Sequence, residues 1–279
     1  MNLIENFNTG SFSRMIWLSQ KAKDTWKDPL DKISALVHEL EVDSVVAEHR
    51  LCAWQTIGEE SVPESSARWA EHGLVSLPLK RVVSFGGFSH KHEEPRSGQP
   101  ASVCLVVART IKDCLDFKDA FINGDNYRQG VMLGFPKCCC KFFDESWSGG
   151  FFDPMWQAAQ ASPAIEENEN LILVKSHPYS NPLLRYIGVR IGFHIPCSFN
   201  CGETIALSTE RMNLARIKNK DLSMILDSLL QMPMEWSSLH GIGMVKTPIF
   251  YIVVQSVPTL ERFVVRTDGT FIPKESCHG

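Results

Sequence analysis

The chain has 279 residues, of which 44% are hydrophobic and 22% are charged, and this length and balance predict a globular protein with a sizeable core. The net charge of −4 excludes a general electrostatic attraction to nucleic acid or to an anionic membrane. No apolar run approaches the roughly 18 residues that cross a bilayer, and the N-terminus lacks a secretory signal pattern, so we expect a soluble cytoplasmic protein without a membrane partner; nucleic acid stays open as a substrate but is not indicated.

A polar, proline-containing segment, Glu59–Ser66, predicts a boundary between two parts of the chain. Before it, apolar residues at helical spacing predict a helical N-terminal appendage of residues 1–60. After it, residues 67–279 are expected to form an α/β domain that carries both cysteine motifs. The strand-then-helix order of Ser102–Ala108 and Ile111–Ile122 is typical of a mixed α/β layer. We therefore predict an α/β (mixed α+β) fold with a central mixed sheet flanked by helices.

The other elements follow from short apolar runs and from helical periodicity. Proline, glycine and charged residues separate them and predict the loops. These patterns predict strands at Leu74–Phe88, Leu171–Lys175, Leu184–Phe193, Ile249–Gln255 and Arg262–Arg266, and helices at Lys137–Trp147, Phe199–Lys218 and Asp221–Met232.

Basic residues occur in two places that bear on function. One of Arg185 and Arg190, on a predicted strand, could present a guanidinium group to an anionic substrate, although exposed arginines on strands are commoner. A second group lies in the predicted helices that follow. We interpret this group as the solvated face of a helix, and it comprises Arg211, Arg216, Lys218 and Lys220.

Nine cysteines is a high number for such a protein, and five of them fall in two short segments. In the first segment, Gly134 and Pro136 precede three consecutive cysteines and a stretch with helical potential. Proline is favoured in the first turn of a helix, so Cys138, Cys139 and Cys140 are expected in that turn. There the positive end of the helix dipole lowers the pKa of a thiol, and free backbone N–H groups can donate to sulfur.

The second segment repeats this arrangement, with an apolar run, His194 and Pro196 before Cys197 and Cys201 at the start of a long predicted helix. The two cysteines are four residues apart, so a helix that begins by Cys197 places them on one face. If both helix starts point into one pocket, that pocket holds thiolates beneath two positive helix ends. The clustered cysteines therefore predict a shared site for a metal ion or an iron–sulfur cluster.

The ligand set is compatible with more than one metal centre. Four thiolates, from Cys138, Cys139, Cys197 and Cys201, satisfy the ligand count of a 4Fe–4S cluster. Zinc held by Cys139, His194, Cys197 and Cys201 satisfies a Cys3His set. The absence of paired C-x2-C knuckles favours iron–sulfur. Because neighbouring residues on a helix point about 100° apart, the three adjacent cysteines are not all expected to face one pocket.

Two interpretations without a metal compete with this one. Buried cysteine behaves as a small hydrophobe, so the three adjacent cysteines could pack between Phe135 and Phe142. A metal-free thiol enzyme could instead use Cys138 or Cys139 as its nucleophile. The sequence contains no phosphate loop, dinucleotide-binding motif, serine-hydrolase elbow or H-E-x-x-H motif, and no C-x3-C-x2-C run of radical enzymes. Nucleotide-driven and common hydrolase chemistries therefore lack support.

The two cysteine blocks also carry a family resemblance. The block Gly134–Phe143 resembles the G-(Y/F)-P-x-C-C-x-x-F signature of an uncharacterised prokaryotic family of unknown function. The block His194–Cys201 is similar to the H-x-P-C-x3-C block of that family. The resemblance implies a prokaryotic intracellular protein, with Cys140 as a bystander and with no activity that can be carried over. The functional positions that it implies are Cys138, Cys139, Cys197 and Cys201.

Our hypothesis from the sequence is a metal-dependent, iron–sulfur enzyme of the redox or sulfur-transfer type that modifies a small molecule, a peptide or a nucleobase. The cysteines hold the metal, and His194 and Glu203 act as acid, base or supporting groups. His240, in a loop before a predicted strand, is a further candidate. The substrate stays open, and the expected partner is an electron or sulfur donor protein. The alternative from another class is a zinc-stabilised binding or scaffold protein without catalysis.

Overall fold

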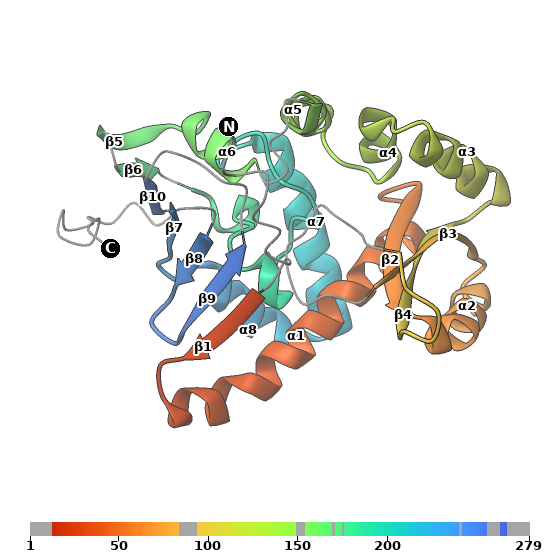
Figure 1. The fold of residues 1–279 in the computed structure, drawn as a ribbon, viewed down its shortest axis with the longest axis horizontal. Coiled ribbons are helices and arrows are strands. Elements are labelled where there is room, and N and C mark those ends of the chain that lie inside the picture. The colour runs from red at the N-terminus through yellow and green to blue at the C-terminus, as the bar shows by residue number, and fades with distance from the viewer. Residues whose placement is uncertain are drawn as a thin grey trace.

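The computed structural model describes residues 13–83, 94–148, 154–168, 171–174, 176–239, 242–255 and 263–266 (Figure 1). These residues form two β-sheets with helices packed around them. The larger sheet is mixed, and a long helix near the N-terminus runs beside it. The predicted α+β fold class, with a mixed sheet flanked by helices, is confirmed.

The larger sheet has seven strands in the order β1-β9-β8-β7-β10-β6-β5. Its described pairs are antiparallel except for β10 with β6, which run parallel. Its strands are β1 (Ser13–Trp17), β5 (Ala164–Asn168), β6 (Leu171–Val174), β7 (Glu235–Leu239), β8 (Ile242–Lys246), β9 (Phe250–Gln255) and β10 (Phe263–Arg266).

The smaller sheet is antiparallel, with the order β2-β4-β3. Helices cover both of its faces, so β4 is almost continuously apolar and buried. Alternate residues show the two faces: Val106 packs with Phe117 of α3, whereas Val107 packs with Trp69 of α2. The elements of this part are β2 (Cys52–Gly58), α2 (Val62–Glu71), β3 (Val75–Val83), β4 (Ala101–Ala108), α3 (Ile111–Ile122) and α4 (Asn126–Met132).

Helix α1 (Gln20–Val46) connects the two cores. The hydroxyl of Ser19 accepts a hydrogen bond from an N–H of the first turn and so caps the helix. Ile33 and Leu40 are buried in the core of the larger sheet, where α7 (Gly202–Lys218) and α8 (Lys220–Leu230) pack against α1. Val45, in the last turn, is buried against the smaller sheet. One long helix therefore fixes the two sheets relative to each other.

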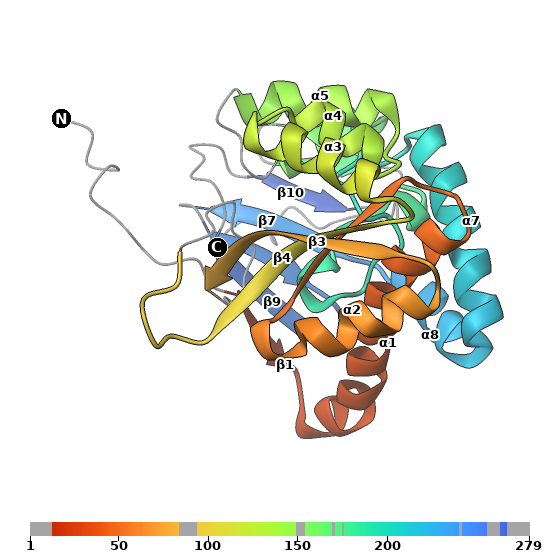
Figure 2. The same ribbon diagram turned by 90° about the vertical axis from the view of Figure 1, so that its right-hand side faces the viewer.

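The route from the smaller sheet to the larger one brings two helix starts together. Helices α3, α4 and α5 (Lys137–Ser148) follow one another along the top of the molecule (Figure 2). Helix α6 (Met155–Gln160) and the strands β5 and β6 come next, followed by a long segment whose described residues, 176–201, contain only two short 3-10 turns before α7 begins. In Figure 1, α5 lies beside the upper end of α7.

Most predicted elements are confirmed, with shifted ends. The strand predicted at Leu74–Phe88 is present up to Val83, and its remaining residues lie outside the described part. The strand predicted at Leu184–Phe193 is wrong. Those residues form a 3-10 turn at Arg185–Ile187 and a loop, and the backbone N–H of Gly188, at φ 74°, returns to a carbonyl of that turn. The apolar residues pack against the core of the larger sheet, but their backbone forms local turns instead of joining a sheet.

The N-terminal residues also depart from the sequence prediction. Besides α1, the described part of residues 1–60 contains the strands β1 and β2, so the uniformly helical assignment is wrong there. Strand β1 pairs with β9, and β2 pairs with β4, so this part of the chain contributes to both sheets. The division into an appendage and a domain stays a prediction. No helix in the described residues combines the length and hydropathy that a membrane span requires.

Candidate metal centre

The first cysteine segment begins α5, as predicted. Gly134 makes the turn before it at φ 70°, where a Cβ atom would lie 2.7 Å from the Cβ of Arg50. Pro136 and the helix start at Lys137 then place the three consecutive cysteines in the first turn. Cys138 is exposed, whereas Cys139 is buried. The sequence therefore determined this half of the site locally.

The second cysteine segment is built differently from the prediction. Helix α7 begins at Gly202, and Cys201 is its N-cap residue. Cys197 lies in the preceding loop, so helical periodicity does not bring it to Cys201. The loop instead turns back, and the backbone N–H of Cys197 donates to the sulfur of Cys139, 3.4 Å away. Cys197 therefore reaches the site through the path of the loop.

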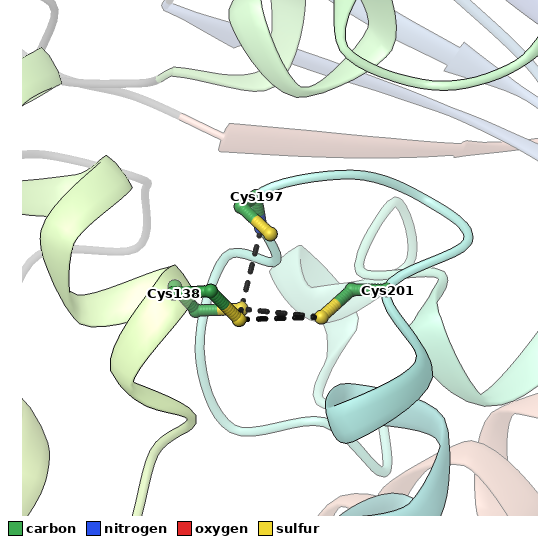
Figure 3. Close-up of side chains that lie close together, drawn as sticks. Cys138, Cys197 and Cys201 are labelled. Atoms are coloured by element: carbon green, nitrogen blue, oxygen red, sulfur yellow. Dashed lines mark hydrogen bonds between the residues drawn. The ribbon is translucent and has the colours of Figure 1, made fainter.

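Four sulfur atoms meet between the starts of α5 and α7. The Sγ atoms of Cys138, Cys139, Cys197 and Cys201, hereafter the four-cysteine group, all lie within 4.8 Å of one another. The Cys201 sulfur is 3.7 Å from both the Cys138 and the Cys139 sulfurs, which are 3.9 Å apart. Figure 3 shows the labelled side chains of Cys138, Cys197 and Cys201 pointing toward one another. This group could bind a metal ion.

Cys140 faces away from the four-cysteine group. Its thiol donates to the backbone carbonyl of Phe135 at 3.6 Å, within its own turn. Its sulfur also packs against α4, where a Cβ atom on Gly130 would lie 2.7 Å from it. Two of the three adjacent cysteines face the group, and the third packs between helices.

Hydrogen bonds between the thiols make their acidities unequal. The Cys139 thiol donates to the Cys201 sulfur, which lowers the pKa of Cys201 to about 4 and raises that of Cys139. Burial, together with the negative charge on Cys201, raises the pKa of Cys197 to about 12. Without a cation, one thiolate is therefore favoured beside protonated thiols. A divalent cation stabilises the further thiolates and releases their protons.

Thr204 links the four-cysteine group to His194. The Thr204 hydroxyl lies 3.3 Å from the Cys139 sulfur and 2.9 Å from Nε2 of His194. Burial, followed by the positive charges of Arg211 and Arg50, lowers the pKa of His194 to about 3, so its ring is neutral. His194 lies outside the four-cysteine group but one hydroxyl away from it. Its predicted role as a supporting group or as an acid or base stays a prediction.

The remaining candidates fall in different places. Glu203 is exposed in the first turn of α7 and does not belong to the four-cysteine group, so the residue that contacts a cysteine is its neighbour, Thr204. His240 lies outside the described residues. The interpretation of Arg211 as solvated is wrong, because this side chain is 0% exposed. Its spacing from Thr204 and Ser208 along one helix face was the available signal.

A cavity of about 280 Å³ adjoins the site. Its wall contains three phenylalanine rings together with aliphatic and polar residues, and it includes Cys139 of the four-cysteine group. The volume approaches the lower end of typical small-molecule pockets. The lining residues that bear on function are Phe135, Phe143, Phe193, His194 and Cys139.

Comparisons with known proteins give no match. No protein-family model matches the chain, and neither a curated protein nor a solved structure matches it.

Proposed function

We propose that the four-cysteine group binds one zinc ion in a tetrahedral site, and that this ion shapes a neighbouring pocket for a small molecule. The separation of the sulfur atoms carries the proposal. The sulfurs of Cys138, Cys139 and Cys201 lie 3.7 to 3.9 Å apart, and the Cys197 sulfur lies within 4.8 Å of each of them. A regular tetrahedron with edges of 3.7 to 3.9 Å has its centre about 2.3 to 2.4 Å from each corner, which agrees with the Zn–S distance of about 2.3 Å. The spacing of these sulfurs therefore fits ligands around a single metal ion.

The proposed ion is structural. Four thiolates complete a tetrahedral zinc site and leave no open position for water or substrate. The ion would join the first turn of α5 to the loop and N-cap of α7, which are otherwise distant in the sequence. Both segments also supply the wall of the cavity, through Phe135 and Cys139 on one side and His194 on the other. Fixing them together fixes the shape of the pocket.

The second candidate is the iron–sulfur enzyme. Exposure of Cys138 favours it, because one corner of the group reaches the surface, where an electron or sulfur donor protein can approach. A 4Fe–4S cluster places four irons and four sulfides between the thiolates. It therefore requires the sulfurs to stand farther apart than around a single ion. The crowded arrangement favours zinc over the cluster.

Metal analysis separates these candidates. The protein is purified without oxygen, and its zinc, iron and acid-labile sulfide are measured together with its visible absorption. We expect one zinc per chain, a colourless sample, and tetrahedral thiolate absorption bands when cobalt replaces zinc. Iron and sulfide near four per chain would support the cluster instead. A metal-free protein with one unusually reactive thiol would point to a thiol enzyme.

Matched variants show which thiols bind the metal. Cys139→Ser and Cys201→Ser should lose the metal, because each removes a ligand from the closed set. Cys140→Ser is the control, since Cys140 lies on the same helix turn but faces Phe135. Retention of full metal by both ligand variants would contradict the proposed site. Catalysis by His194 or Glu203 and membership of the prokaryotic family stay proposals that these measurements leave open.

A further inference from the structure

Three arginines converge on one partly buried aromatic ring beside the cavity. The Cζ atoms of Arg50, Arg190 and Arg211 lie 5.9, 6.0 and 4.2 Å from the centre of the Phe193 ring. Arg211 is 0% exposed and Arg50 is 4% exposed. These residues come from the loop after α1, the segment before α7, and α7 itself. We call Arg50, Arg190 and Arg211 the arginine cluster.

Most of the donor groups in the cluster have no partner in the described part of the chain. Arg50 donates through Nε to the carbonyl of Cys52, but both of its terminal nitrogens are buried and unpaired. All three side-chain nitrogens of Arg211 are buried and unpaired. Arg190 pairs with Glu41 at 3.0 Å. Glu210, beside Arg211 in the sequence, is exposed. Three guanidinium groups thus face one carboxylate, which leaves two positive charges uncompensated.

An unpaired charge in a protein interior is costly. The penalty persists even after the surroundings relax, and arginine does not lose its proton in proteins. Burial lowers the pKa of Arg211 well below its ordinary value, and the neighbouring charge of Arg50 lowers it further. The cluster therefore requires a negative group that the described side chains do not supply.

The four-cysteine group is a possible source of that charge, but its position argues against it. Thr204 and the neutral ring of His194 stand between the sulfurs and the cluster. No hydrogen bond joins Arg50 or Arg211 to a sulfur atom among the residues that the structure describes. The cluster and the four-cysteine group are therefore separate polar centres on the two sides of His194.

We propose that the arginine cluster binds a doubly charged oxyanion, such as a phosphate group. Two uncompensated guanidinium groups match the charge of a dianion, and guanidinium donors match the geometry of its oxygens. Two further buried, unpaired atoms belong to the same region: Oγ of Ser208, one turn before Arg211 on α7, and Nδ1 of His194. A Cβ atom on Gly192 would lie 3.5 Å from that Oγ, so Ser208 faces the loop that carries Phe193.

The neighbouring cavity could hold the uncharged part of the proposed ligand. Phe193 and His194 belong both to its wall and to the surroundings of the cluster. The guanidinium group of Arg50 also lies 5.6 Å from the ring of Phe135, another wall residue. A small phosphorylated molecule can therefore place its charged group at the arginines and its apolar part among the aromatic rings. This inference needs no particular metal in the four-cysteine group.

Thermal unfolding with inorganic phosphate tests the proposal. For the full chain, phosphate at about a hundredfold excess over Kd should raise Tm by about 5 °C or more relative to chloride of equal ionic strength. Calorimetric titration should show one phosphate per chain, and acetate should bind more weakly. Absence of phosphate binding in both measurements would overturn the proposal, and this wild-type test needs no variant to fold.

A variant of Arg211 distinguishes a phosphate site from the alternative in which the four-cysteine group balances the charge of the arginines. Arg211→Met should abolish the phosphate-dependent rise in Tm and, in phosphate-free buffer, unfold at the wild-type temperature or above it, because it removes an unpaired buried charge. Arg216→Met, an exposed position on the same helix, should keep the phosphate response. Loss of bound metal from Arg211→Met would instead show that the arginine cluster balances the charge of the four-cysteine group. Metal content and phosphate binding are measured separately, so either proposal can fail alone.

Discussion

Two groups of cysteines in this protein show how surroundings decide what a thiol does. In the smaller sheet, Cys52 and Cys114 are fully buried in an apolar cluster with Phe117. Their sulfurs contact backbone carbonyls, and burial raises the pKa of Cys52 to about 12 and that of Cys114 to about 11. In the four-cysteine group the sulfurs contact one another. The first group packs as small hydrophobes, whereas the second could bind a shared cation.

This difference comes from packing rather than from residue type. A thiol surrounded by apolar side chains is stable as a neutral group and has no use for a metal. Several thiols in contact compete for protons, so that one becomes a thiolate and the others become harder to ionise. A divalent ion removes that competition by accepting all of the sulfurs as ligands.

The largest expected effect is the loss of the metal. Chelation, or the variant Cys201→Ser, should lower the free energy of unfolding by more than about 4 kcal/mol, because loss of a bound metal is among the most destabilising changes. Denaturant unfolding with and without chelator measures this. The same chelator should not change the unfolding curve of Cys201→Ser, because this variant is expected to hold no metal. If chelator does not shift the wild-type unfolding curve, neither group of cysteines stabilises the protein through a bound metal.

A smaller expected effect is the loss of folding stability at acidic pH that comes from protonation of His194 in the unfolded state. Its pKa is about 3 in the native state against an ordinary value of 6.5, so only the unfolded state takes up the proton between these values. The stability that it contributes is present above pH 6.5 and falls below it by up to about 1.4 kcal/mol per pH unit, or about 2 kcal/mol at pH 5.

Replacement of His194 checks this slope. His194→Gln should show a flatter loss of stability than the wild type between pH 6.5 and 5 in metal-free protein. Cys201 and the other titrating groups are present in both proteins, so the difference between the two profiles isolates His194. Identical profiles would show that its ring takes up a proton in the native state.

The hydroxyl of Thr204 should matter for metal affinity. Thr204→Val keeps the side-chain shape but removes the contacts to the Cys139 sulfur and to Nε2 of His194. We expect metal to bind about 10-fold more weakly, as for other groups that contact metal ligands, with a stability loss of about 1–2 kcal/mol. Competition with a chromophoric chelator measures the affinity. Thr209→Val, at an exposed hydroxyl of the same helix, is the control.

The smallest effect should come from the apolar cysteines. Cys114→Ala should cost about 1 kcal/mol through lost packing and should leave the metal content unchanged. The thiol has a native pKa of about 11 against 9.0, so its contribution is present below pH 9 and is lost as the pH rises toward 11. The variant should therefore lose less stability than the wild type in alkali. Loss of metal from this variant would contradict the prediction that Cys114 takes no part in metal binding.

Local patterns predicted those elements whose apolar residues follow one clear period. The helix predicted at Ile111–Ile122 has the observed ends of α3, and the predicted strand Ser102–Ala108 differs from β4 by one residue. The prediction for Leu184–Phe193 failed because a short apolar run has no period that distinguishes a strand from a packed loop. Strand β1 was missed because its partner, β9, lies more than 200 residues later.

The sequence by itself indicated a site shared by the two cysteine segments, because cysteines directly after Gly and Pro at a helix start already indicate sulfur chemistry. The tertiary structure decided which of Cys138, Cys139 and Cys140 face that site. The sequence did not determine the spacing of the sulfurs, which follows from the loop that returns Cys197 to Cys139. Nor did it reveal the arginine cluster. Arg50 and Arg211 are far apart in the chain, and only the packing of both around Phe193 leaves their charges buried together.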